Sequence, residues 1–154
     1  MESVFSTVVV ASDHAAVEFK ADIINHLKSL NVTVIDVGTH STDSCDYPDY
    51  AHDACEKIQT NEAQAGVLVC GSGIGISIAA NKHKGIRAAL CHDYYTAKMC
   101  REHNDANIIC MGARTTGIEV AKQMVEVWLT TPFCTENPNH ARRLEKISQL
   151  ENSN

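Results

Sequence analysis

The sequence lacks any apolar run close to the roughly 20 residues that a helix needs to cross a bilayer. Its first residues, Met1 to Phe5, carry an acidic side chain and no basic one, so we expect neither a membrane span nor a secretory signal. It has only three prolines in 154 residues and shows no internal repeat. With 44% hydrophobic and 21% charged residues, the composition is that of an ordinary globular chain rather than a disordered, collagen-like or coiled-coil one.

Positive charge is also scarce. The 13 lysines and arginines are outnumbered by 19 acidic residues, which gives a net charge of −6. Such a surface disfavours binding to nucleic acid or to an anionic membrane. The seven cysteines are an odd number, with no CxxC pair and no Cys/His spacing typical of a zinc site. We therefore expect no metal and interpret them as reduced thiols of a cytoplasmic protein.

Short β-branched runs alternate with longer segments of helical period, which predicts an α/β fold. The predicted strands are residues 7–11, 32–37, 66–70, 86–90 and 106–111, and the predicted helices are residues 15–30, 48–59, 74–82, 94–101, 117–129 and 140–150. Strands without polar alternation, each followed by a helix, indicate a parallel sheet covered on both faces. We expect residues 1–154 to form one domain, a three-layer αβα sandwich with a Rossmann-like, five-stranded parallel sheet.

In such sheets the ligand crevice lies beyond the carboxyl ends of the strands. A glycine-rich loop, Gly71-Ser72-Gly73-Ile74-Gly75, occupies that position after the third strand. Its backbone amides suit an anionic oxygen or a phosphate. Three kinds of ligand could bind such a loop. A P-loop nucleotide would require Gly-Lys-Ser/Thr at the end of the loop, which is absent, and the dinucleotide fingerprint is broken at Ile76, although Asp93 has the right spacing. The third ligand is the oxyanion of a small substrate. A tight turn without any ligand is the plain alternative.

Cys70 ends the third strand immediately before this loop. The adjacent amides and the following helix favour the thiolate form of a cysteine at such a position. A thiolate there can act as a nucleophile or as a base that abstracts a proton. Composition alone also allows a buried core cysteine, which is how we interpret the other six.

Further polar candidates lie at strand ends. Asp13 and His14 follow the first strand, where Asp13 either caps the next helix or joins the site. His103 and Asn104 precede the fifth strand and suit acid/base work. Arg114 follows that strand and is a candidate phosphate ligand. The last helix carries Arg142 and Arg143 beside an apolar stripe, so we expect it to pack on a partner subunit.

Four segments carry a resemblance to a known family. They are Asp13-His14, Asp46-Tyr47-Pro48, residues 70–82 (CGSGIGISIAANK) and residues 103–108 (HNDANI). Over residues 8–147 the chain closely resembles the type B ribose-5-phosphate isomerases, a group related to galactose-6-phosphate and allose-6-phosphate isomerases. The resemblance implies interconversion of ribose 5-phosphate and ribulose 5-phosphate through a cis-enediolate, in the non-oxidative pentose phosphate pathway, without a metal or another cofactor.

The resemblance also implies roles for individual residues. Cys70 is the base that moves a proton between C2 and C1, and the amides of Gly71, Gly73, Ile74 and Gly75 stabilise the enediolate. Ser72 moves the proton between O1 and O2. His103 opens the sugar ring with Asp13 nearby, whereas Tyr47 and Asn104 contact the sugar. His14, Arg114 and Arg143 match phosphate-binding positions.

One position departs from the family pattern. Asn139 precedes His140 where many relatives carry an arginine, and Arg142 is the cation that could replace it. The family implies a homodimer or tetramer whose sites are completed across the interface. The alternatives to the pentose-phosphate isomerase are an isomerase of a hexose 6-phosphate, such as allose or galactose 6-phosphate, and a sugar-phosphate sensor without catalysis.

Overall fold

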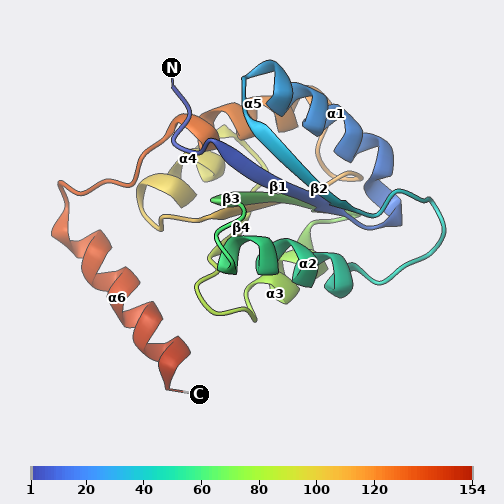
Figure 1. The fold of residues 1–154 in the computed structure, drawn as a ribbon. Helices are drawn as coiled ribbons and strands as arrows, with labels where there is room; N and C mark the ends of the chain where they lie inside the picture. The colour runs from blue at the N-terminus through green and yellow to red at the C-terminus, as the bar shows by residue number, and fades with distance from the viewer. Residues whose placement is uncertain (1, 154) are drawn as a thin grey trace.

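The computed structural model describes residues 2–153 and contains a five-stranded sheet in which all paired strands run parallel. The strands are β1 (Thr7–Ser12), β2 (Thr33–Gly38), β3 (Ala65–Cys70), β4 (Ala88–Leu90) and β5 (Ile108–Gly112). Their order across the sheet is β2-β1-β3-β5-β4 (Figure 1). The predicted five-stranded parallel sheet is therefore confirmed.

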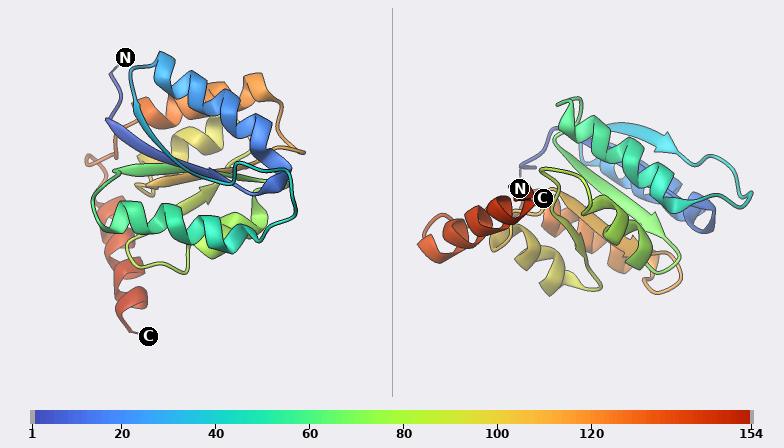
Figure 2. Two further views of the ribbon diagram at one scale, coloured as in Figure 1. Left: turned by 45° about the vertical axis from the view of Figure 1, so that its right-hand side comes forward. Right: turned by 90° about the horizontal axis from the view of Figure 1, so that it is seen from below.

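Helices cover both faces of this sheet, as Figure 2 shows from two sides. They are the 3-10 turn η1 (His14–Ala16) and the helices α1 (Val17–Ser29), α2 (Tyr47–Gln59), α3 (Ile74–Ala80), α4 (Tyr94–Glu102), α5 (Ile118–Thr130) and α6 (Pro138–Asn152). Residues of α1, α4 and α5 form one buried cluster, and residues of α2 and α3 form the other. The three-layer sandwich is thus confirmed, with helix ends within a residue or two of the prediction.

Side-chain alternation along the strands decides which layer each residue enters. In β1, Val8 and Val10 face the layer of α1, α4 and α5, whereas Val9 and Ala11 face α2 and α3. Both sets are fully buried, which explains why residues 8–11 are all apolar. The same alternation in β3 turns Cys70 toward the layer of α2 and α3. Within residues 2–153, no helix has the length and apolar character to cross a membrane.

The helix α6 stands apart from the three layers (Figure 1). None of its residues is buried, and the side chains of Ile147 and Leu150 are 45% and 69% exposed. A helix of this length is marginal in water without tertiary packing, because nucleation is unfavourable and few contacts offset it. Within this chain the apolar stripe of α6 is therefore left largely open to solvent.

Burial of the Cys55 side chain predicts a loss of stability at alkaline pH. Cys55 lies on α2, is fully buried, and its thiol donates to the Ala80 carbonyl at 3.8 Å. Burial raises the pKa of this thiol from its ordinary value of 9.0 to about 12. The unfolded chain therefore loses this proton first, so stability present below pH 9 declines as pH rises toward 12.

We expect the free energy of unfolding, measured with denaturant in the presence of reductant, to fall between pH 8 and pH 11. The fall should be smaller in Cys55→Ala, which has one buried thiol fewer. An identical fall in both proteins would show that Cys55 does not contribute to it.

Candidate active site

The loops that follow β1 and β3 diverge to opposite faces of the sheet. From β1 the chain enters α1 on one face, and from β3 it enters α3 on the other. Since β1 and β3 are neighbours, this is a topological switch point, where open α/β sheets bind their ligands. The amide of Asp13 donates to the Val69 carbonyl at 3.2 Å and ties the two loops together. The place at which the sequence predicts the ligand site is therefore a switch point of the sheet.

Cys70 is the last residue of β3 and is 4% exposed. Its Sγ accepts a hydrogen bond from the backbone amide of Gly73 at 3.1 Å. A backbone N–H directed at the sulfur stabilises negative charge there. The hydroxyl of Ser72, which is close by in the loop, accepts from the amide of Ile74 at 3.2 Å. The glycine loop thus holds the thiol and the hydroxyl through its own backbone.

The residue at position 73 must be glycine for this arrangement to form. Gly73 has a φ of +76°, a conformation that L side chains rarely adopt. An added Cβ would also lie 2.6 Å from Cδ1 of Leu90 and 2.8 Å from the carbonyl carbon of Met111. The loop therefore passes directly over the ends of β4 and β5, which brings its amides to the carboxyl edge of the sheet.

The ring of Tyr47 covers the end of the same loop. Tyr47 begins α2, and an added Cβ at Gly75 would lie 2.5 Å from its Cζ. The Tyr47 side chain is 39% exposed, so part of the ring remains open to solvent. This contact joins α2 to α3 and places a phenol beside the glycine loop.

A methyl group at position 75 should displace the Tyr47 ring. We expect Gly75→Ala to raise KM for the sugar phosphate about tenfold and to lower stability by about 1–3 kcal/mol, the usual cost of overpacking. The matched control is Gly117→Ala, because an added Cβ at Gly117 meets no atom within 4 Å. Steady-state kinetics and thermal unfolding check both variants. An unchanged KM in Gly75→Ala would mean that Tyr47 does not contact the substrate.

Asp13 and His14 lie at the end of β1, beside the β3 loop. The Asp13 carboxylate accepts from the amide of Ala15 at 3.0 Å, so this 7% exposed side chain caps η1. The Nδ1 atom of His14 accepts from the backbone amide of Cys45 at 3.2 Å. That bond leaves the proton of a neutral imidazole on Nε2, where it can be donated to an anion.

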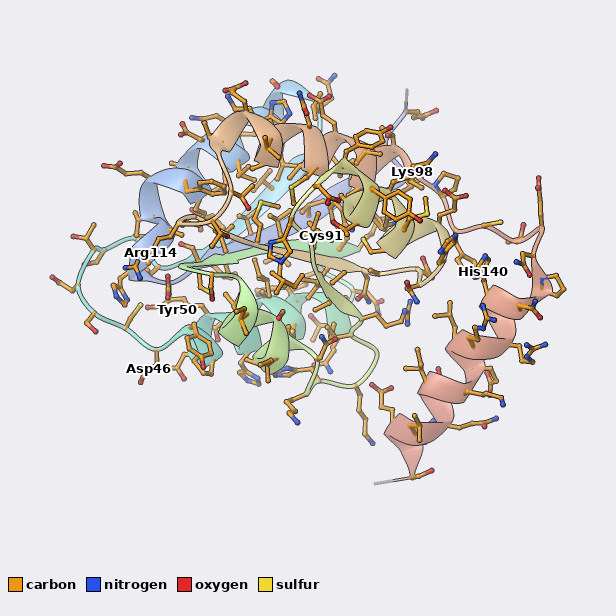
Figure 3. The ribbon with its side chains drawn as sticks, turned by 180° about the vertical axis from the view of Figure 1, so that it is seen from behind. Asp46, Tyr50, Cys91, Lys98, Arg114 and His140 are labelled. Atoms are coloured by element: carbon orange, nitrogen blue, oxygen red, sulfur yellow. The ribbon has the colours of Figure 1, made fainter. Side chains whose placement is uncertain are left out.

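Arg114 reaches back from the end of β5 over the glycine loop. Its Nη1 lies 3.2 Å from where a Cβ on Gly71 would be, and its backbone amide donates to the Gly71 carbonyl at 3.0 Å. In the part of the chain that the structure describes, no carboxylate lies within ion-pair distance of this guanidinium. Figure 3 shows Arg114 at the same end of the molecule as Asp46 and Tyr50 of the neighbouring segment. A cation is thus available at the mouth of the crevice.

His103 and Asn104 lie at the opposite edge of the sheet. They come between α4 and the beginning of β5, whereas Cys70 is at the carboxyl end of the neighbouring strand β3. The His103 ring stacks on His140 of α6, with centroids 4.4 Å apart and an interplanar angle of 16°. In Figure 3, His140 is on the other side of the molecule from Arg114. Within one chain, His103 and Asn104 therefore do not reach Cys70.

Arg142 and Arg143 are also separated from Cys70 within the chain, because both are exposed residues of α6. Asn139 lies in the first turn of α6, where its amide donates to the side chain of Asn137 at 3.1 Å. The predicted residues from the two loops, α2 and the end of β5 therefore gather around the carboxyl ends of β1, β3 and β5. The predicted residues from α6 and the 103–104 segment do not reach these strand ends within the chain.

The dinucleotide interpretation of the loop finds no support. Ile76, where that fingerprint has glycine or alanine, is fully buried in the core. Asp93 caps α4 by accepting from the amide of Thr96 at 2.7 Å. This bond, and to a smaller extent the bond from the Thr96 hydroxyl, lowers the pKa of the Asp93 carboxyl. The spacing of Asp93 from the loop therefore reflects helix capping rather than contact with a ribose.

Sequence reasoning missed Cys45. It was interpreted with the core cysteines, yet it is half-buried and its amide fixes the orientation of His14. Its Sγ also lies 3.7 Å from the same imidazole nitrogen. Position 45 directly precedes Asp46-Tyr47-Pro48, and that proximity to a candidate motif was the one available signal.

Comparisons with known proteins identify the family of this chain. The ribose/galactose isomerase family matches residues 8–147. Ribose-5-phosphate isomerase B of Escherichia coli is 42% identical over 139 residues, covering 90% of this chain and 92% of that protein. D-erythrulose-4-phosphate isomerase of Pectobacterium atrosepticum is 39% identical, covering 94% of this chain and 95% of that protein.

The structure of ribose-5-phosphate isomerase B from Clostridium thermocellum superposes with a TM-score of 0.92 at 43% identity. The alignment covers 96% of this chain and 98% of that one. The family resemblance inferred from the motifs is thus confirmed over nearly the whole chain. The protein belongs to the ribose/galactose isomerase family of sugar isomerases.

Proposed function

We propose that the protein interconverts ribose 5-phosphate and ribulose 5-phosphate, with Cys70 as the base. The observation that carries the proposal is the hydrogen bond from the Gly73 amide to Sγ of Cys70 at the switch point of the sheet. It gives a thiolate a stabilising donor at the carboxyl end of β3. The family match and the names of relatives at about 40% identity support the substrate class.

The reaction would proceed by proton transfer between neighbouring carbons. The Cys70 thiolate takes the proton from C2 of the open-chain aldose, and the C1 carbonyl oxygen becomes the enediolate oxygen. The Cys70 thiol then returns a proton to C1, while the Ser72 hydroxyl passes a proton between O1 and O2. The loop amides not engaged by Cys70 and Ser72 stabilise the developing negative charge, which is the role of an oxyanion hole.

The phosphate would lie at the mouth of the crevice. His14 offers its Nε2 proton and Arg114 its guanidinium, and both flank the glycine loop. A bidentate guanidinium and an imidazole N–H are matched donors for phosphate oxygens. Tyr47, which covers Gly75, would then contact the sugar between the phosphate and Cys70.

We further propose a homodimer in which each site is completed by the partner. The exposed stripe of α6 supports this, as does the position of His103 at the edge opposite Cys70. His103 of the partner subunit would open the sugar ring, and Asn104 of the partner subunit would contact its hydroxyls. Arg143 of the partner subunit would add to the phosphate site. Arg142 of the partner subunit would supply the cation that is missing at position 139, where this chain has asparagine. All seven cysteines are free thiols, which fits a reducing, cytoplasmic location.

An isomerase of another phosphorylated sugar is the second candidate. It is favoured by the 39% identical relative named for D-erythrulose 4-phosphate and by the family's galactose branch. The same proton-transfer groups would serve a tetrose or a hexose 6-phosphate, because the reacting carbons are equivalent. The distance from the phosphate ligands to Cys70 would then select the chain length.

Proton NMR in D2O tests the proposal. The protein is incubated with EDTA and ribose 5-phosphate, and in parallel with erythrulose 4-phosphate, allose 6-phosphate and galactose 6-phosphate. We expect ribulose 5-phosphate to form with deuterium incorporated at the exchanging carbon. Turnover of only another sugar would favour the second candidate, and no turnover of any of the four would favour a sensor without catalysis.

A further inference from the structure

Two histidines that are not part of the proposed site lie against each other, His52 on α2 and His83 just after α3. The Nδ1 atom of His52 lies 2.9 Å from Nε2 of His83, with ring centroids 5.2 Å apart and an interplanar angle of 35°. His52 is exposed and His83 is half-buried. The proposed isomerisation uses neither residue. Two imidazole nitrogens from different elements are thus held together at a position that solvent can reach.

The surrounding backbone fixes which nitrogen of His83 carries the proton. Its Nδ1 lies 3.1 Å from the Ala79 carbonyl and 3.2 Å from the Ala80 carbonyl at the end of α3. Carbonyl oxygens only accept, so Nδ1 of His83 is the donor and Nε2 keeps its lone pair. His52 must then donate from Nδ1 in the neutral pair. The lone pair on Nε2 of His83 therefore points at His52, while its other ring nitrogen is held by backbone carbonyls, as in a metal-ligating histidine.

We propose that His52 and His83 form a binding site for a divalent transition-metal ion of the Zn²⁺, Ni²⁺ and Cu²⁺ class. When the ion binds, the proton on Nδ1 of His52 is released to water and another is taken up on Nε2. Both rings stay neutral, and each directs one lone pair at the ion. No net proton is lost, and the hydrogen bond between the rings is replaced by two metal–nitrogen bonds.

The spacing of the rings fits such an ion with a small adjustment. Two imidazole nitrogens bound to one tetrahedral ion at about 2.0–2.1 Å are roughly 3.3 Å apart. The observed 2.9 Å therefore needs to widen by about 0.4 Å, which rotation of the exposed His52 ring can supply. Imidazole nitrogen suits Zn²⁺, Ni²⁺ and Cu²⁺, whereas Mg²⁺ and Ca²⁺ prefer oxygen ligands.

The neighbouring side chains limit the site to two protein ligands. Among residues 2–153, no group of three or more His, Cys, Asp or Glu side chains is arranged around one point, so water completes the coordination. Cys55 shares the Ala80 carbonyl with His83, but burial raises the pKa of its thiol to about 12 and it remains a protonated donor. Glu56 lies one helical turn beyond His52 on α2 and adds negative charge on that side.

Metal binding at this position would add a further connection between α2 and the end of α3. The two helices already meet through Tyr47 and Gly75 at the start of α3 and through the Cys55 thiol and the Ala80 carbonyl at its end. Because the ion binds the folded chain more tightly than the unfolded one, it should stabilise the fold by mass action. The crevice residues themselves are not ligands, so binding does not depend on the proposed isomerase activity.

Calorimetric titration of the full-length protein with NiCl₂ tests the inference, in a non-chelating buffer with a phosphine reductant. The variants are His52→Gln, His83→Gln, the double variant, and His40→Gln as a control that removes another exposed histidine. We expect wild type and His40→Gln to bind one Ni²⁺ that both single variants bind at least tenfold more weakly. The double variant should be no weaker than either single variant, and Ni²⁺ should raise Tm only where the pair is intact.

Three results would overturn the inference. They are equal Ni²⁺ binding in wild type and both single variants, losses in the single variants that add up in the double variant, and no binding of Ni²⁺, Zn²⁺ or Cu²⁺ by wild type. Additive losses would indicate independent surface histidines.

A second measurement uses the unaltered chain and so does not depend on the folding of variants. In ¹⁵N NMR of the histidines, Zn²⁺ should convert His52 from the Nδ1–H to the Nε2–H tautomer. An unchanged tautomer at saturating Zn²⁺ would contradict the bridging site.

Discussion

Replacing Cys70 with alanine is expected to lower turnover of ribose 5-phosphate about a thousandfold, within the range that a positioned general base contributes. In the proposed mechanism the Cys70 thiolate removes the C2 proton, and an alanine side chain cannot accept it. The Gly73 amide also loses the sulfur that it contacts at 3.1 Å. Binding of the phosphate should change little, because His14 and Arg114 are untouched, so the loss should appear in kcat rather than in KM.

The fold should survive this change, since the side chain loses a single sulfur at the end of a strand that is otherwise fully buried. Cys110→Ala is the matched control. Cys110 lies in the neighbouring strand β5, is fully buried, and belongs to the same core cluster as Cys70. We expect it to retain most of the activity while losing a similar amount of stability.

Solvent exchange separates loss of the base from loss of the whole site. Wild type should place deuterium on the sugar in D2O, and Cys70→Ala should place none over the same time. If Cys70→Ala retains more than about a tenth of wild-type turnover, proton abstraction belongs to another group, because removal of a true base costs at least a hundredfold. Ser72→Ala, which keeps the thiol, should show a smaller loss.

The helices and strands could be predicted from the sequence because the apolar pattern that marks each of them is local. Strand β3 is an uninterrupted apolar run and is buried on both faces, and the stripe of Ile23 and Leu27 on α1 faces the core as its spacing indicates. The parallel sheet then places every strand's carboxyl end at one edge. That rule alone brings Asp13 and the glycine loop together, although 57 residues separate Asp13 from Cys70.

The contacts within the crevice could not be predicted in the same way. The approach of Tyr47 to Gly75 depends on how closely α2 packs on α3, which no local pattern specifies. The bond from the Cys45 amide to His14 joins a loop to a helix start 31 residues earlier. Asp13 had two interpretations from the sequence, and the structure shows that it does cap η1 while lying at the crevice.

The separation of His103 from Cys70 has a different cause. A residue that precedes a parallel strand and a residue that ends its neighbour lie at opposite edges of the sheet, so no packing within one chain can bring them together. If both act in one reaction, they must come from different subunits. The exposed α6, whose His140 stacks on His103, lies on that same side and offers a surface for the second chain.

Mixing two inactive variants should therefore restore activity. In a dimer of Cys70→Ala with His103→Ala, one site combines the intact Cys70 of one chain with the intact His103 of the other, and the second site lacks both. Random exchange of subunits makes half of the dimers mixed, each with one intact site of two, so about a quarter of wild-type activity should return.

The subunits are exchanged by mild denaturation and refolding of the mixture, and formation of ribulose 5-phosphate is the readout. Each variant refolded alone is the control and should stay inactive. If instead both residues acted within one chain, every site in every dimer would lack one of them and the mixture would stay as inactive as its components. Recovery thus reports directly on whether the opposite edges of two sheets meet in one site.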